Sequence, residues 1–189
     1  MIDTSPSMQR WIALLRAINV GGHTVTMAVL RRHIEALGFA AVETMLASGN
    51  VILEAPSADA SALEAQIAQQ LQQALGYPVA TFLRSPAEIT AIAHHQPFPP
   101  TEPDGTEHAL SVAFLPTVPD EAAQQRLLAL QTALDDLHVF GREVYWRCHT
   151  KVSASTFSGA RLEQALGMPA TIRTITTVRR LAAKYGVDG

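Results

Sequence analysis

Residues 71–89 read LQQALGYPVATFLRSPAEI, and residues 162–178 read LEQALGMPATIRTITTV. The two stretches match once two residues are deleted after the proline, which places Arg84-Ser85 on Arg173-Thr174. Each stretch carries the end of a helix at a glycine, a short strand, and a hydroxyl residue suited to cap the next helix. Favoured turn residues can recur by chance, but the ordered agreement favours a duplicated unit of roughly ninety residues.

The predicted elements run in the same order in both halves of the chain. In the first half, hydrophobic periodicity predicts strands over 10–18, 41–47, 50–55 and 79–84, and helices over 26–38, 60–75 and 85–95. In the second half, it predicts strands over 108–115, 137–140 and 143–148, and helices over 120–134 and 158–166. The repeated order β-α-β-β-α-β is that of ferredoxin-like domains.

The expected fold class is therefore α+β, with two ferredoxin-like units in tandem and antiparallel sheets backed by helices. The first unit is expected over 8–94 and the second over 107–186. Residues 95–106 hold four prolines and are expected to form the linker between the two units.

The composition is that of a globular protein, because 48% of the residues are hydrophobic. No stretch holds the run of about 18 apolar residues that spans a membrane, and no basic region followed by an apolar leader opens the chain. The single cysteine, Cys148, agrees with a reducing compartment. We expect a cytoplasmic protein with no membrane partner.

Charge is distributed unevenly along the chain. Residues 54–138 carry two Arg or Lys against eleven Asp or Glu, whereas residues 139–189 carry eight against three. The acidic middle argues against a protein coated in nucleic acid, and the aromatic content of 6% argues against a sheet that stacks RNA bases. The basic C-terminal part could still contact phosphate at one surface.

The stretch LLRAINVGG, residues 14–22, places a cation inside an apolar run. Strand alternation predicts two faces that both begin apolar: Ile12, Leu14, Arg16 and Ile18 on one, and Trp11, Ala13, Leu15, Ala17 and Asn19 on the other. Two apolar faces predict a central strand. Because an unpaired buried charge is costly, Arg16 is either a structural clamp with its own acceptors or the charged contact of an anion.

Two turn-forming stretches are expected beside the end of that strand. Asn19-Val20-Gly21-Gly22 precedes a helix, which is the general geometry of an anion site, but it lacks a complete phosphate-loop signature. Ser48-Gly49-Asn50 reads first as a hairpin turn. The end of the first strand meets the beginning of the third in a split βαβ unit. The candidate ligand-binding residues are therefore Arg16, Asn19, Gly21, Gly22, Ser48, Gly49 and Asn50, with Arg84 and Arg173 as duplicated cations at strand ends.

These stretches, with FLRS, GREVYW and PATIRTITTVRRL, resemble the domain of unknown function 1697 family along nearly the whole chain. The family pattern is similar to Leu-Leu-Arg-Gly-Ile-Asn-Val-Gly-Gly, followed by Met-Ala-x-Leu and Ser-Gly-Asn. The matching positions are Arg16, Ile18, Asn19, Gly21, Gly22, Met27, Leu30, Ser48, Gly49 and Asn50. The resemblance implies an α+β fold and supplies no activity, because the family is named for lacking one.

Three positions depart from the family pattern. Ala17 stands where the family usually has a glycine, which reduces any close approach of a ligand to that backbone. After Arg173 the chain reads TITTV, without the asparagine and the aromatic residue of the family. Lys151 lies several residues before the family's lysine. The resemblance therefore does not carry a C-terminal site over to this chain.

No metal or cofactor is expected. His94 and His95 are adjacent, but no third ligand stands at metal-binding spacing. Cys148 and His149 should point to opposite faces of a strand, which disfavours a thiolate–imidazole pair.

The remaining polar residues form no recognisable acid/base pair. Ser153, Ser155 and Ser158 read as a polar loop, and Asp135 and Asp136 read as solvated residues at a helix end. Three functions stay open: a binding module for an anion such as phosphate, nucleotide or nucleic acid, an enzyme acting on a small anionic metabolite, and a protein–protein interaction module. The sequence does not fix the oligomeric state.

Overall fold

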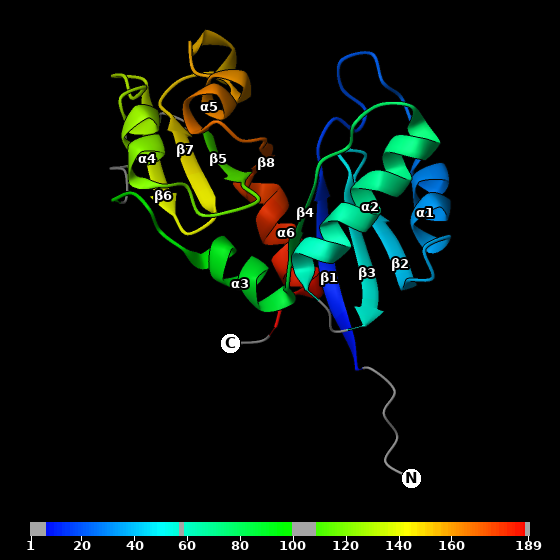
Figure 1. Ribbon diagram of the computed structural model, residues 1–189. Coiled ribbons are helices and arrows are strands. Elements are labelled where there is room, and N and C mark those ends of the chain that lie inside the picture. The colour runs from blue at the N-terminus through cyan, green and yellow to red at the C-terminus, as the bar shows by residue number, and fades with distance from the viewer. Residues whose placement is uncertain (1–6, 57–58, 100–108, 188–189) are drawn as a thin grey trace. The chain divides into compact units, whose positions relative to one another are not determined.

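The computed structural model describes residues 7–56, 59–99 and 109–187. These residues form two compact units that divide between Glu88 and Ile89. Each unit contains one four-stranded antiparallel sheet with helices packed on it (Figure 1). The expected α+β class and the tandem ferredoxin-like pattern are confirmed. Most of the predicted linker, from residue 100 onward, lies outside the described residues.

The first unit has its strands in the order β2-β3-β1-β4. Its elements are β1 (Met8–Leu15), α1 (Met27–Glu35), β2 (Ala40–Met45), β3 (Asn50–Pro56), α2 (Ala60–Leu75) and β4 (Thr81–Arg84). β1 lies between β3 and β4, so it is the central strand that its two apolar faces predict.

Local sequence signals begin and end the helices of this unit. Thr26 caps α1, and its hydroxyl accepts a hydrogen bond from the backbone N–H of Val29. Asp59 caps α2 in the same way, through the N–H of Ser61. α2 ends where Gly76 adopts the left-handed conformation, with φ of 81°.

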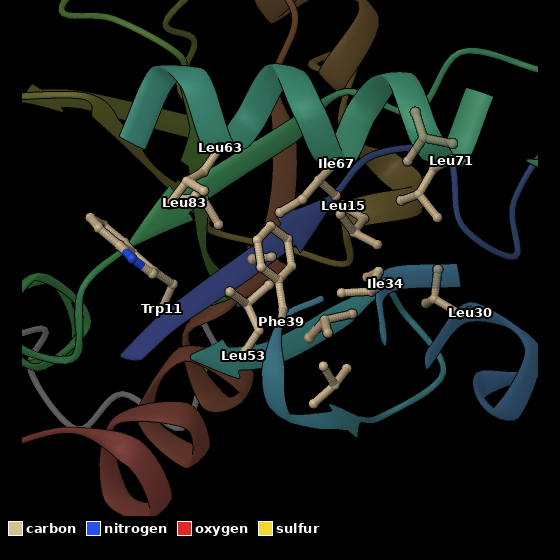
Figure 2. Close-up of a cluster of buried hydrophobic side chains, with 14 of the residues drawn as sticks. Trp11, Leu15, Leu30, Ile34, Phe39, Leu53, Leu63, Ile67, Leu71 and Leu83 are labelled. Carbon is tan, nitrogen blue, oxygen red and sulfur yellow. The ribbon is translucent and has the colours of Figure 1, made fainter. Parts of the chain in front are cut away.

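The core of the first unit lies between its sheet and the two helices α1 and α2 (Figure 2). Side chains on one face of β1 pack against residues spaced by three or four along each helix, which is the spacing of a helical face. The labelled members of this cluster are Trp11, Leu15, Leu30, Ile34, Phe39, Leu53, Leu63, Ile67, Leu71 and Leu83.

The predicted faces of β1 hold only as far as Leu15. Arg16 lies beyond the strand, and Ala17 has a left-handed backbone with φ of 63°. This conformation breaks the alternation, so Ile18 packs into the same core as Leu15. The placement of Ile18 with Ile12 and Leu14 on the opposite face was therefore wrong.

The second unit has its strands in the order β6-β7-β5-β8. Its elements are α3 (Pro86–His94, which begins before the division), β5 (Ala109–Phe114), α4 (Glu121–Leu128), β6 (Asp135–Phe140), β7 (Glu143–Cys148), the short 3-10 helix η1 (Val152–Ala154), α5 (Gly159–Leu166), β8 (Thr171–Thr174) and α6 (Ile175–Tyr185). α4 and α5 cover one face of the sheet. Against the other face, the hydroxyl of Tyr145 donates to the carbonyl of Ile92 in α3 at 3.1 Å.

Both repeated stretches form helix, strand and helix, as the duplication predicts. α2 and α5 each end at a left-handed glycine, Gly76 and Gly167. Arg84 then pairs with Ile12 of β1, and Arg173 pairs with Val112 of β5. The two arginines therefore occupy equivalent places in their sheets.

The helix predicted over 120–134 is shorter than expected. α4 ends at Leu128, and the residues from Asp135 onward form β6, which pairs with β7. Pairing with a neighbouring strand satisfies the backbone of this segment and overrides its helix propensity. Asp135 is consequently buried in a strand, so its interpretation as a solvated residue at a helix end was wrong.

Asp135 and Asp136 each accept hydrogen bonds from side chains of the second unit. Burial raises the pKa of Asp135, but hydrogen bonds from Trp146, Ser155 and Thr132 outweigh burial and lower the pKa below its ordinary value. Asp136 accepts from Arg147 at 2.7 Å and lies 2.6 Å from Nε2 of His149. No sequence motif indicated either network.

No helix in the described part of the chain has the length and apolar character needed to cross a membrane. Over the same residues, no group of three or more His, Cys, Asp or Glu side chains is arranged to hold a metal ion. The ring of His95 instead stacks on that of Phe140, with 4.1 Å between the ring centroids.

Candidate functional site

The end of β1 meets the beginning of β3, as the split βαβ pattern predicts. Leu14 lies opposite Asn50, and the N–H of Leu15 donates to the carbonyl of Gly49 at 2.8 Å. The N–H of Arg16 donates in turn to the carbonyl of Ala80, also at 2.8 Å. We call this end of the first sheet the rim, and define it as residues 16–25 and 46–50.

Asn19 joins the two segments of the rim. Its side-chain amide donates to the carbonyl of Ala47 at 2.9 Å, and its side-chain oxygen accepts from the N–H of Val25 at 2.8 Å. The residue itself has a left-handed backbone with φ of 55°, a conformation that asparagine adopts more readily than most residues. Asn19 therefore positions both loops.

Asn50 and Ser48 close the second segment of the rim. The side chain of Asn50 is fully buried, and its amide donates to the carbonyl of Met45 at 2.9 Å and to the hydroxyl of Ser48 at 3.0 Å. These bonds replace those that a buried amide would lose from water. The turn reading of Ser48-Gly49-Asn50 is therefore the one that its side-chain contacts support.

Two features of position 49 require glycine. Its φ is 76°, and a Cβ at this position would lie 2.9 Å from Cβ of Ile18. Gly21 and Gly22 also have positive φ, but no atom lies within 4 Å of a Cβ built on either. The loop glycines are therefore needed for conformation alone, whereas Gly49 is also needed for the close approach of the two loops.

Left-handed backbone is concentrated at the rim. Among the described residues, four that are not glycine have positive φ, and three of them, Ala17, Asn19 and Leu46, lie at the rim. For alanine and leucine this conformation costs roughly 1–2 kcal/mol relative to an ordinary one, and for asparagine less. The rim is thus held in an unfavourable backbone geometry by the hydrogen bonds of Asn19 and Asn50.

Arg16 is half-buried at the base of the rim. The loop that follows it is exposed, and Val20 is 57% exposed at its tip. His23 stacks on Tyr77, with 3.8 Å between the ring centroids, so the far side of the loop also rests on the unit. The rim therefore presents a cation beside an exposed but anchored loop.

Arg84 does not join Arg16 at the rim, and Arg173 belongs to the second unit. Arg84 lies at the other end of β4 from Ala80, is fully buried, and donates to the carbonyl of Leu83 at 2.8 Å. Arg173 occupies the equivalent place in the second unit and donates to Thr171 and to the carbonyl of Ile172, both at 2.9 Å. Burial lowers the pKa of Arg173 to about 10. Contacts with nearby backbone fit a structural role for both residues.

The sequence interpretation missed a cleft in the second unit. It is lined by residues of α3 and α6, among them Thr90, His94 and Arg179. The only signal in the sequence was the match between the segments after Arg84 and Arg173, which predicts that the two helices carry equivalent positions.

Comparison with solved structures places the fold with that of a bacterial protein. The structure described as that of conserved bacterial protein SP0830 from Streptococcus pneumoniae matches with a TM-score of 0.71 at 22% identity, covering 95% of this chain and 99% of that chain. At this identity the likeness supports the fold alone. A search of curated proteins finds no match.

The family comparison agrees with the rim motifs. Residues 8–145 match the family described as "Protein of unknown function (DUF1697)", a range that includes the whole rim and ends before the departures at 171–178. The match spans more than half of the chain. The chain belongs to the DUF1697 family of proteins of unknown function.

Proposed function

We propose that the chain is a binding module for a small oxyanion, phosphate or carboxylate, at the rim, with Arg16 as the charged contact. The observation that carries this proposal is the concentration of left-handed, non-glycine backbone at Ala17, Asn19 and Leu46, beside a half-buried cation. Unfavourable backbone geometry persists where the surrounding structure fixes it, and such places are often binding sites.

The loop that follows Arg16 has backbone N–H groups that are available to a ligand. The backbone N–H groups of Val20, Gly21 and Gly22 donate to no atom in the described part of the chain. Consecutive N–H groups in turns with left-handed residues can converge on an anion. A guanidinium adds a planar fork of donors that matches the oxygens of phosphate or carboxylate.

Three residues of the predicted site position the loop and do not contact the ligand themselves. Asn19, Ser48 and Asn50 hold the rim together by bonds to one another and to backbone carbonyls. The side-chain amides of Asn19 and Asn50 donate within the protein, and the hydroxyl of Ser48 accepts from Asn50. In this proposal they position the loop, and the ligand contacts Arg16 and the backbone of Val20 to Gly22.

The test is a titration of the isotope-labelled full-length chain with sodium phosphate at constant ionic strength, followed by amide NMR. The amides of Gly21 and Gly22 should shift with saturation, and Arg16→Met should weaken binding by roughly tenfold to a hundredfold, the usual worth of a charge-assisted contact. Arg10→Met is the matched control, because Arg10 lies in β1, whose end precedes Arg16, but pairs with Glu54 at 2.8 Å, away from the rim.

The same variants separate the proposed site from a purely structural arginine. If Arg16 is a structural clamp, Arg16→Met should lower the free energy of unfolding by roughly 1–3 kcal/mol while phosphate leaves the wild-type amides of Gly21 and Gly22 unmoved. Binding that falls steeply with salt and prefers a polynucleotide over phosphate would instead indicate a nucleic-acid surface.

A further inference from the structure

A cleft of about 480 Å³ lies between α3 and α6. Its lining residues all belong to the second unit: Thr90, Ala93, His94, Arg179, Ala182, Ala183, Gly186 and Val187. Its volume lies in the range of roughly 300–1,000 Å³ that is typical of small-molecule sites.

The residues of α3 that line this cleft are equivalent, in the duplicated sequence, to the residues of α6 that line it. When Arg84 is placed on Arg173, Thr90 falls on Arg179, and Ala93 falls on Ala182. His94 likewise falls on Ala183. The alanines are kept in both copies and leave space, whereas the polar positions differ, so the duplication has produced an asymmetric cleft between equivalent helix faces.

Gly186 keeps the end of the cleft closely packed. A Cβ at this position would lie 2.4 Å from both the carbonyl oxygen of Ala182 and the hydroxyl of Thr90. The φ of Gly186 is −67°, so glycine is needed here for space and not for conformation. The hydroxyl of Thr90 also accepts from the N–H of Val187 at 3.1 Å, which ties the end of α6 to α3.

The polar groups of the cleft have unused hydrogen-bonding capacity. Arg179 is exposed and makes no hydrogen bond or ion pair with the described part of the chain. Nδ1 of His94 lies 2.9 Å from the carbonyl oxygen of Thr90, which can only accept, so Nδ1 carries a proton and Nε2 is left for a ligand. Among the described residues, none that lines the cleft is acidic.

We propose that the α3–α6 cleft is a second binding site, for a small molecule that carries a phosphate or carboxylate group. Arg179 supplies the charge and a fork of donors, and His94 supplies a second polar contact through Nε2. The small side chains of Ala93 and Ala182 leave room for the rest of the ligand. This site is distinct from the rim, because all of its described lining residues belong to the second unit.

The test uses the labelled full-length chain, titrated separately with sodium phosphate and sodium malonate, with sodium chloride holding the ionic strength constant. The amide of Gly186 should shift with saturation for at least one of the two anions, and the anion that binds more tightly gives the ligand class. Arg179→Met should weaken this binding at least tenfold, and Ala183→Trp, which fills the exposed side of the cleft, should abolish it.

Arg180→Met is the matched control, because it removes the same charge from the next residue of α6, which does not line the cleft. It should leave the titration of Gly186 unchanged. Equal weakening by Arg179→Met and Arg180→Met, or no saturable shift of Gly186 with either anion, would overturn the proposal. Arg16→Met should not alter the Gly186 titration, and Arg179→Met should not alter those of Gly21 and Gly22, so failure at one site is distinguishable from failure at the other.

Discussion

The side-chain amide of Asn19 donates to the carbonyl of Ala47, a residue 28 positions away in the chain, at 2.9 Å. This bond joins the loop after the central strand to the turn between β2 and β3. The same side chain accepts from Val25 through its oxygen. The conformation of the rim therefore depends on one residue whose two polar atoms serve different segments.

Removing this connection should destabilise the first unit. We expect Asn19→Ala to lower the free energy of unfolding by roughly 1–3 kcal/mol, because two hydrogen bonds are lost and alanine tolerates positive φ less well than asparagine. Asn19→Asp keeps the acceptor for Val25 but loses the donor to Ala47, so it should cost less. Urea unfolding of the three proteins measures both differences, and equal costs for the two variants would show that the bond from Val25 contributes nothing.

Replacing Ala17 by glycine should stabilise the protein. Ala17 has φ of 63°, which costs an L-residue roughly 1–2 kcal/mol, while glycine adds roughly 0.5–1 kcal/mol of entropy loss on folding. The net gain should be a few tenths to about 1 kcal/mol in urea unfolding. Ala65→Gly, on the exposed face of α2, is the control and should destabilise by about 1 kcal/mol.

Alanine substitutions at Gly49 and Gly22 distinguish the free-energy cost of a positive φ from the cost of a steric contact. Both have positive φ, but only a Cβ at Gly49 would meet Ile18. Gly22→Ala should therefore cost a few tenths to about 1 kcal/mol, the reverse of the gain expected at Ala17, and Gly49→Ala should cost a further 1–3 kcal/mol, roughly, from overpacking. Thermal unfolding measures the two changes, and similar losses for both would show that the loops relax apart without penalty.

The depressed pKa of Asp135 predicts a loss of stability in acid. A carboxyl group with a lower pKa in the folded state than in the unfolded state stabilises the protein above the unfolded pKa, about 3.9. That contribution is lost as the pH falls through the lower, folded pKa. Urea unfolding from neutral pH to about pH 2 should show this loss, and Asp135→Asn should be less stable at neutral pH and flatter over the acid range.

The fold was predicted from the repeat between 71–89 and 162–178 together with the same order of elements in both halves. Hydrophobic periodicity, capping residues and stop glycines are local signals, and they agreed with the structure at Thr26, Gly76 and Gly167. The helix predicted to continue after Leu128 does not form. Strand pairing is a nonlocal interaction, and here it outweighs a helix propensity of roughly a few tenths of a kcal/mol per residue.

The sequence predicted which segments meet at the candidate site, but not the hydrogen bonds that their side chains make. The sequence determined that Arg16, Asn19 and the turn at 48–50 would meet, because strand order in a split βαβ unit follows from element order. The tertiary structure alone decided that Asn19 and Asn50 bind backbone carbonyls, and that Ile18 turns into the core after a left-handed Ala17. It also decided that equivalent faces of α3 and α6 border one cleft. These facts depend on atomic distances between segments far apart in the chain, which residue type and periodicity do not specify.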